Sequence, residues 1–102
     1  MSITLGLDIG TTSTIGILIE LPNRVLGLTS RPSTLHSPQH GWAEEDPAEW
    51  WANVCEVTRE LLATSGIEAG QISAVGVTGM LPAVVLLDDA GQVLRPSIQQ
   101  SD

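Results

Sequence analysis

A short run of residues near the N-terminus has the composition of a phosphate-binding turn. Asp8 is followed, after one isoleucine, by Gly10, Thr11, Thr12 and Ser13. Gly10 would let the backbone approach a bulky anion closely, and successive backbone N–H groups with the hydroxyls can form an anion nest. Asp8 is a hard oxygen ligand that suits Mg²⁺ held through water. These residues indicate either a site for the terminal phosphates of a nucleotide–metal complex or an ordinary hairpin turn with a solvated aspartate.

Other candidate side chains are weaker. His36 and His40 flank a loop that contains a proline, but nothing nearby supplies the further ligands that a metal site needs. Trp42 could stack on a sugar, although packing is the simpler interpretation. Cys55 is the single cysteine, which excludes an internal disulfide and any multi-cysteine metal site.

Composition limits the classes of partner. The 102 residues are 42% hydrophobic and suit one domain at most. The net charge is -8, with only four Lys and Arg, so DNA, RNA and anionic membrane surfaces would be repelled. The N-terminus has no basic region and no long apolar run, which predicts neither a signal peptide nor a membrane span. We therefore expect a cytoplasmic protein that binds neither nucleic acid nor membranes.

Three strands are expected to position the phosphate turn. Residues 3–8 alternate between apolar and polar or small side chains, and residues 14–20 alternate again, with Ile15, Ile17 and Ile19 on one face. The short connection between them implies a hairpin. Residues 25–29 read as a third strand, which completes an antiparallel meander.

A long polar loop and a helix come next. The loop covers residues 31–46. Asp46 is a good N-cap, Pro47 suits the first helical position, and Glu49 could complete a capping box. Gly66 supplies the stop, so the helix should be roughly 27 Å long. One apolar stripe is predicted along it, made of Trp50, Val54, Val57 and Leu61 and widened by Trp51, Thr58 and Leu62.

The last third of the chain predicts a strand and a second hairpin. Residues 72–78 are short, apolar and β-branched, which favours a buried strand parallel to an earlier one. Residues 83–87 and 92–94 flank a turn of sequence DDAG.

Four segments together resemble the FGGY carbohydrate kinases of the actin-like ATPase superfamily. LGLDIGTTS at residues 5–13 resembles the family's opening phosphate motif, and GWAEEDPAEWW at residues 41–51 resembles its next segment. ISAVGVTG at residues 72–79 resembles the following strand. The segment from residue 86 to 98, with LLD, a glycine and LRPSI, matches the hairpin and its exit. The resemblance spans nearly all of the chain and is strongest to xylulose kinases.

This resemblance implies a fold and a reaction. The fold would be α/β, ribonuclease-H-like: the meander, the helix, a further strand and a hairpin form the N-terminal portion. The reaction would be transfer of phosphate from ATP to a sugar or polyol hydroxyl with Mg²⁺, in a cleft between two domains. Asp8 would organise the magnesium–phosphate complex, and Gly10 to Ser13 would cradle the phosphates. The family's catalytic base lies beyond residue 102, so residues 1–102 would be an incomplete N-terminal domain without the second ATPase domain, inactive alone.

The substrate side departs from the family pattern. Met80, Leu81 and Pro82 stand where relatives carry polar side chains that hydrogen-bond the sugar or polyol. They would border the sugar but could not form the same hydrogen bonds to its hydroxyls. Xylulose and glycerol are therefore expected to be poor substrates. This turn could equally serve packing alone. Asp102 keeps the family's substrate-binding carboxylate.

Two further expectations concern the chain as a whole. The altered pocket leaves open an alternative function, a non-catalytic nucleotide- or sugar-binding module. A longer domain would cover apolar surfaces that are expected to be exposed here, at Leu61–Leu62, Val75–Val77 and residues 83–87. These surfaces predict self-association of residues 1–102, through exposed strands or by exchange of the hairpin at residues 83–94.

Overall fold

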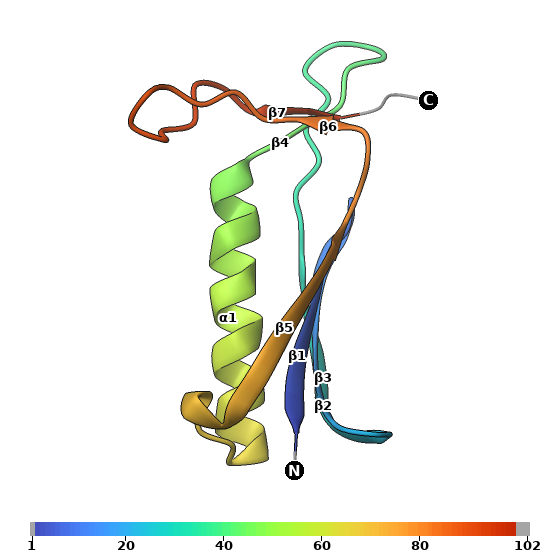
Figure 1. The fold of residues 1–102 in the computed structure, drawn as a ribbon. Helices are drawn as coiled ribbons and strands as arrows, with labels where there is room; N and C mark the ends of the chain where they lie inside the picture. The colour runs from blue at the N-terminus through green and yellow to red at the C-terminus, as the bar shows by residue number, and fades with distance from the viewer. Residues whose placement is uncertain (1, 100–102) are drawn as a thin grey trace.

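The computed structural model of the chain describes residues 2–99. One helix packs against one face of a four-stranded sheet, and a small three-stranded sheet crosses one end of both (Figure 1). Within residues 2–99, no helix is both long enough and apolar enough to span a membrane.

The predicted meander is confirmed. Strands β1 (Ile3–Ile9), β2 (Ser13–Glu20) and β3 (Arg24–Pro32) pair antiparallel in sequence order. Strand β5 (Ile72–Gly79) pairs in parallel with β1, as expected for a strand that follows a helix. The sheet order is β3-β2-β1-β5, which agrees with the first half of a ribonuclease-H-like domain.

The two faces of this sheet differ in what covers them. On the helix side, Ile3, Leu5, Leu7 and Leu18 form the buried core with two residues of the helix. Cross-strand partners share a face, and in the β1–β2 register Asp8 lies opposite Ile15, and Gly6 opposite Ile17. The isoleucines of β2 therefore share the face that carries Asp8, away from the helix.

Helix α1 (Pro47–Ser65) begins and ends where the sequence predicts. The Asp46 carboxylate accepts a hydrogen bond from the backbone N–H of Ala48 at 2.9 Å, and Gly66 closes the helix at a φ of 75°. The predicted capping box does not form. The Glu49 carboxylate instead accepts two hydrogen bonds, from the backbone N–H and from the hydroxyl of Thr34. Glu49 thereby attaches the preceding loop to the first turn of α1.

Burial along α1 follows the predicted stripe only in part. Val57 and Leu61 are buried, and Trp50 and Val54 are half-buried. Trp51 is 69% exposed, although the stripe included it. Asn53, which was not part of the predicted stripe, is buried. Its Nδ2 donates to the Pro32 carbonyl at 3.0 Å, which gives this carbonyl at the end of β3 a hydrogen-bond partner.

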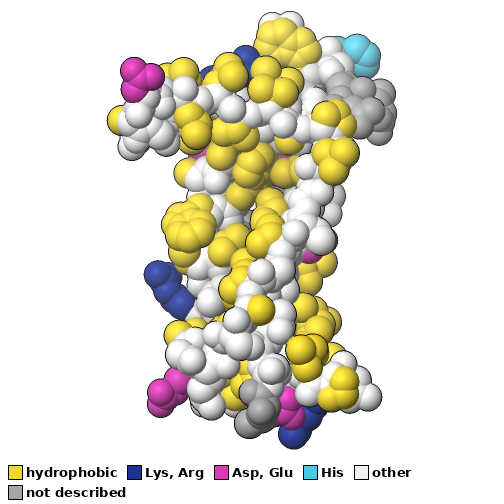
Figure 2. Space-filling view, viewed as in Figure 1, with side chains coloured by type: hydrophobic (Ala, Val, Ile, Leu, Met, Phe, Trp, Pro, Cys, Tyr) yellow, Lys and Arg dark blue, Asp and Glu magenta, His cyan; other side chains and the backbone are white. Residues whose placement is uncertain are grey.

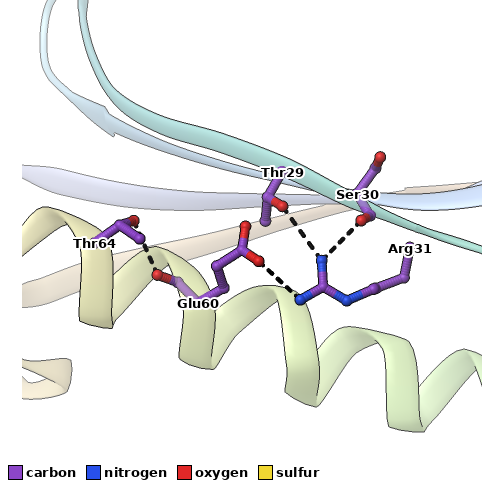
Figure 3. A network of polar contacts seen from close by, with 5 residues as sticks. All are labelled: Thr29, Ser30, Arg31, Glu60 and Thr64. Carbon is purple, nitrogen blue, oxygen red and sulfur yellow. Dashed lines mark hydrogen bonds and ion pairs between the residues drawn. The ribbon is translucent and has the colours of Figure 1, made fainter.

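A polar network joins the outer strand to the helix (Figure 3). The Arg31 guanidinium donates to Glu60 Oε1 at 2.8 Å, to the Ser30 carbonyl at 2.9 Å and to Thr29 Oγ1 at 3.4 Å. Hydrogen bonds from Thr29 and Arg31 hold the pKa of the Glu60 carboxyl below its ordinary value. Since β3 is an edge of the sheet, this network fixes that edge against α1.

The region from residue 31 to 46 is more ordered than the predicted loop. Strand β3 continues to Pro32, and Glu44–Glu45 form strand β4. Strand β4 pairs antiparallel with β7 (Ser97–Gln99), which also pairs with β6 (Ala83–Val84), giving the order β4-β7-β6. The small sheet was not predicted, because its strands are two or three residues long and come from distant parts of the chain.

The predicted hairpin at residues 83–94 is only partly correct. The turn exists, with the Asp88 N–H donating to the Gln92 carbonyl and Leu87 bridging to Val93. The ladder does not extend along residues 83–87, because β6 takes β7 as its partner instead.

Strand β5 has the sequence of a buried strand but is exposed within residues 2–99, as expected for Val75 and Val77, whereas the expected exposure of Leu61 is wrong. Val75 and Val77 are 58% and 63% exposed. In the parallel register they lie beside Leu5 and Leu7 on the helix side of the sheet. However, α1 packs on β2 and β3 and leaves this side of β5 uncovered. A short 3-10 turn, η1 (Ala69–Gln71), leads from α1 into β5.

Candidate functional site

The predicted phosphate turn joins β1 to β2 and is closed by its own backbone. The Gly10 N–H donates to the Ser13 carbonyl at 2.9 Å. A Cβ on Gly10 would lie 3.1 Å from that same oxygen, so the tight turn favours glycine. Thr11 and Thr12 are exposed, and neither donates a hydrogen bond to another backbone group within residues 2–99. Their N–H groups and the Thr12 hydroxyl are therefore free to bind an anion, while the Thr11 hydroxyl is directed toward the Met80 sulfur.

Asp8 is held in place by a residue that sequence reasoning missed. Thr78, near the end of β5, donates its hydroxyl to Asp8 Oδ1 at 2.8 Å. The parallel register places the two residues side by side. The signal in the sequence was a threonine before the glycine that ends the strand, but its partner follows only from the strand order. The other carboxylate oxygen remains available to solvent or a ligand, since Asp8 is exposed.

The structure brings the predicted substrate turn against the phosphate turn. The Met80 N–H donates to the Ile9 carbonyl at 3.0 Å, and the Thr11 hydroxyl lies 3.7 Å from the Met80 sulfur. Both turns follow the carboxyl ends of neighbouring parallel strands, which meet at one edge of the sheet. This is the edge at which open α/β sheets bind their ligands.

A pocket of about 180 Å³ lies between the two turns. Its walls are the turn from Met80 to Pro82, Thr11 of the phosphate turn, and Leu35, Ala43 and Gln99. Leu81 is the most exposed apolar side chain among them, at 85%. Thr11 and Gln99 supply its polar side chains. Asp102, the predicted substrate carboxylate, lies outside the described residues.

A second pocket of about 250 Å³ lies beside strands β4 and β7. Trp42, which is half exposed, lines it together with Glu44, Arg95, Ile98 and Gln99. The Arg95 guanidinium forms an ion pair with the Glu44 carboxylate. This pairing leaves the pocket with little free charge.

Within residues 2–99, no group of three or more His, Cys, Asp or Glu side chains could hold a metal ion, and this includes His36 and His40.

A buried carboxyl stands where β4 meets α1. Glu45 is fully buried, its Oε1 accepts a hydrogen bond from the Trp50 indole N–H at 2.9 Å, and its Oε2 has no partner within the described residues. Burial raises the pKa of the Glu45 carboxyl above its ordinary value; the Trp50 hydrogen bond opposes this, and the nearby Glu49 carboxylate adds to it.

An apolar groove of about 470 Å³ runs between α1 and β5. Trp50, Trp51 and Val54 line it from the helix, and Val77 and Met80 line it from the strand and the turn beyond. Figure 2 shows hydrophobic side chains gathered between these two elements. The groove lies on the helix face of β5, whereas Asp8 lies on the opposite face.

The residues of the phosphate turn fit a nucleotide–magnesium complex. Asp8 offers a carboxylate oriented by Thr78, which suits a cation that keeps several waters and binds phosphate oxygens. The exposed turn at Thr11 and Thr12 offers donors to the phosphates. No Lys or Arg lies between residues 8 and 13, so the turn segment carries no cationic side chain of its own.

Comparison with known proteins gives a consistent result. The model for the N-terminal domain of the FGGY family of carbohydrate kinases matches residues 3–102. A glycerol kinase of Rhizobium meliloti (strain 1021) is 34% identical over 99 residues, which are 96% of this chain and 20% of that protein.

Two solved structures add to this. The xylulose kinase from Rhodospirillum rubrum is 60% identical, with a TM-score of 0.90 over 98% of this chain and 20% of its own. The gluconate kinase from Lactobacillus acidophilus is 28% identical, with a TM-score of 0.85 over 95% of this chain and 19% of its own. The chain spans about a fifth of the length of the relatives it matches.

Proposed function

The chain belongs to the FGGY family of carbohydrate kinases, and we propose that the protein containing it transfers the terminal phosphoryl group of ATP to a hydroxyl of a small sugar or polyol. The observation that carries this proposal is the contact between the two turns. The turn from Gly10 to Ser13 and the pocket beside Met80 lie side by side at one edge of the sheet, which supports phosphate binding next to a small acceptor.

The residues of this chain have separate roles in the proposed reaction. Asp8, oriented by Thr78, holds the metal–phosphate complex through a carboxylate oxygen. The donors of Thr11 and Thr12 bind the phosphate oxygens. Mg²⁺ would supply charge neutralisation of the phosphates when bound. Positioning and electrostatic stabilisation are the main terms in phosphoryl transfer, and both are what these residues can provide.

The remaining parts of the active site come, in this proposal, from outside residues 1–102. These 102 residues form part of an N-terminal domain, and a catalytic base and a second domain for the adenosine complete the cleft. The protein would act in the cytoplasm. The relatives are named for glycerol, xylulose and gluconate, so family membership leaves the acceptor open.

The test is an ADP-release assay of the full-length protein with a panel of ketoses, aldoses and polyols. We expect one acceptor class to be phosphorylated, with xylulose and glycerol as poor acceptors because Met80, Leu81 and Pro82 offer no strong hydrogen-bonding groups. Xylulose as the best acceptor would show that the turn does not determine specificity.

The Asp8→Asn variant tests the phosphate turn. Asparagine can still accept from Thr78 but lacks the charge, so we expect kcat to fall by about 10²- to 10³-fold. Thermal unfolding should not change, because Asp8 is exposed. An unchanged kcat at saturating Mg·ATP would refute the assigned role. If no acceptor supports ADP release, while Mg·ATP or a sugar still binds, the alternative of a non-catalytic module would hold instead.

A further inference from the structure

The inner face of the small sheet is unusually polar at strand β7. Ser97 is fully buried and Gln99 is 8% exposed, whereas Ile98 between them is 42% exposed. Side chains alternate along a strand, so the two polar residues face the interior and the isoleucine faces solvent. Burying polar groups costs free energy unless they are hydrogen-bonded, and this arrangement therefore needs a reason.

The Gln99 side chain is fixed at one end and free at the other. Its Nε2 donates to Ser97 Oγ at 2.8 Å, and its backbone N–H donates to the Ala43 carbonyl at 2.9 Å. Within residues 2–99, Gln99 Oε1 accepts no hydrogen bond.

Gln99 lines both the pocket beside Trp42 and the pocket between the two turns. In the pocket between the turns it lies together with Thr11 and the turn from Met80 to Pro82. Thr11 belongs to the phosphate end, and the hydrocarbon side chains of the pocket can neither donate nor accept strong hydrogen bonds. Gln99 is therefore the group in this pocket that can recognise a hydroxyl away from the phosphates.

We propose that the Gln99 side-chain amide hydrogen-bonds one hydroxyl of the acceptor substrate, and so takes over recognition that the turn at Met80 to Pro82 cannot provide. The side chains of Leu35, Leu81 and Pro82 contact the C–H faces of the acceptor's carbon chain. The substrate class is a small sugar or polyol that presents a single hydroxyl to this end of the pocket. This inference rests on the proposed kinase function.

The test compares acceptors that lack one hydroxyl each, in the full-length protein. For one deoxy position, wild-type kcat/KM should fall by about tenfold or more, because the amide is left unpaired. In Gln99→Leu, KM for the intact acceptor should rise by about tenfold. The penalty at that same position should disappear, while KM for ATP stays unchanged. Ile98→Val, on the exposed face of the same strand, is the matched control and should keep wild-type kinetics.

The comparison of deoxy penalties in wild type and Gln99→Leu distinguishes a role of Gln99 in substrate recognition from a purely structural role. A purely structural role would lower stability or kcat for every acceptor alike, without removing the penalty at one position. If Gln99→Leu does not fold, Gln99→Met, which is longer and more flexible, replaces it. An active kinase whose deoxy penalties are the same in wild type and variant would overturn this inference alone. A protein that phosphorylates no acceptor would overturn the proposed function, and this inference with it.

Discussion

At the scale of single residues, the site depends on side chains that are held from a distance in sequence. Asp8 and Thr78 are seventy residues apart and meet through the parallel pairing of β1 and β5. Gln99 reaches the pocket only because β7 crosses the end of the main sheet. Asp8 and the turn beside it could be predicted from local composition. Thr78 and Gln99 could not, because their roles depend on strand pairings that no local pattern encodes.

Glu45 gives a prediction at this scale. Its folded-state pKa is raised above the ordinary value of 4.5, mainly by burial. A raised pKa means that its contribution to stability is fully present below the unfolded pKa and is lost as the pH rises through the folded pKa. Glutamine keeps an acceptor for the Trp50 indole N–H but cannot ionise. We therefore expect Glu45→Gln to match wild type near pH 4 and to become increasingly more stable than wild type as the pH rises toward 7.

Urea unfolding of wild type and variant across this pH range measures the effect. Glu49 contributes part of the shift by like-charge repulsion, so Glu49→Gln should reduce the pH dependence without abolishing it. Parallel stability curves for wild type and Glu45→Gln would show that the Glu45 carboxyl is hydrated in solution.

At the scale of elements, α1 and the sheet approach each other through two glycines. A Cβ on Gly16 would lie 3.0 Å from Leu61 Cδ1 and from Val57 Cγ2, and a Cβ on Gly27 would lie 2.9 Å from Leu61 Cδ2. The helix and its start and stop were predictable from capping residues and periodicity. Which residues of β2 it would cover was not, since the isoleucines of β2 are the more hydrophobic set. Packing space, which the glycines provide, selects the covered face instead.

Gly16→Ala tests this close approach. The added methyl group has no room without a shift of Leu61 or Val57, so we expect a destabilisation of about 1–3 kcal/mol. Gly70→Ala is the control, because a Cβ there would meet nothing within 4 Å and should change stability by no more than about 0.5 kcal/mol. Combined with Leu61→Ala, the cost of Gly16→Ala should shrink, since the truncated side chain leaves space. Fully additive free energies of unfolding would argue against direct contact.

At the scale of the whole chain, α1 covers only part of the face of the sheet on which it packs. The helix covers β2 and β3, while β5 forms an edge and exposes its valines beside the apolar groove. The burial of Leu61, which was expected to be exposed, could not be predicted, because it depends on which strands α1 covers. The fold class could be predicted from the order of elements, and so could the exposure of Val75 and Val77.

This exposure predicts that residues 1–102 self-associate when isolated. Strand β5 pairs with β1 on one side only within the described residues, and an unpaired edge beside an apolar surface favours association. Exchange of residues 83–94 is a poorer route than the free edge, since the pairing within that segment is confined to the few residues beside its turn. Sedimentation velocity at micromolar concentrations should therefore show species larger than a monomer, in increasing proportion as the concentration rises.

The surface responsible can be located with two matched variants. Val77→Lys places a charge on β5 at the groove and should shift the chain toward monomer, because burying an unpaired charge is costly. Leu28→Lys places the same charge on β3, the other edge of the sheet, at a side chain that is 66% exposed. It should leave association unchanged, since β3 is fixed against α1 by Arg31 and Glu60 and lines no part of the groove. A monomeric wild-type chain with sharp cooperative unfolding would mean that residues 1–102 form a self-sufficient domain; an equal effect of both lysines would mean that general charge, rather than the β5 edge, controls association.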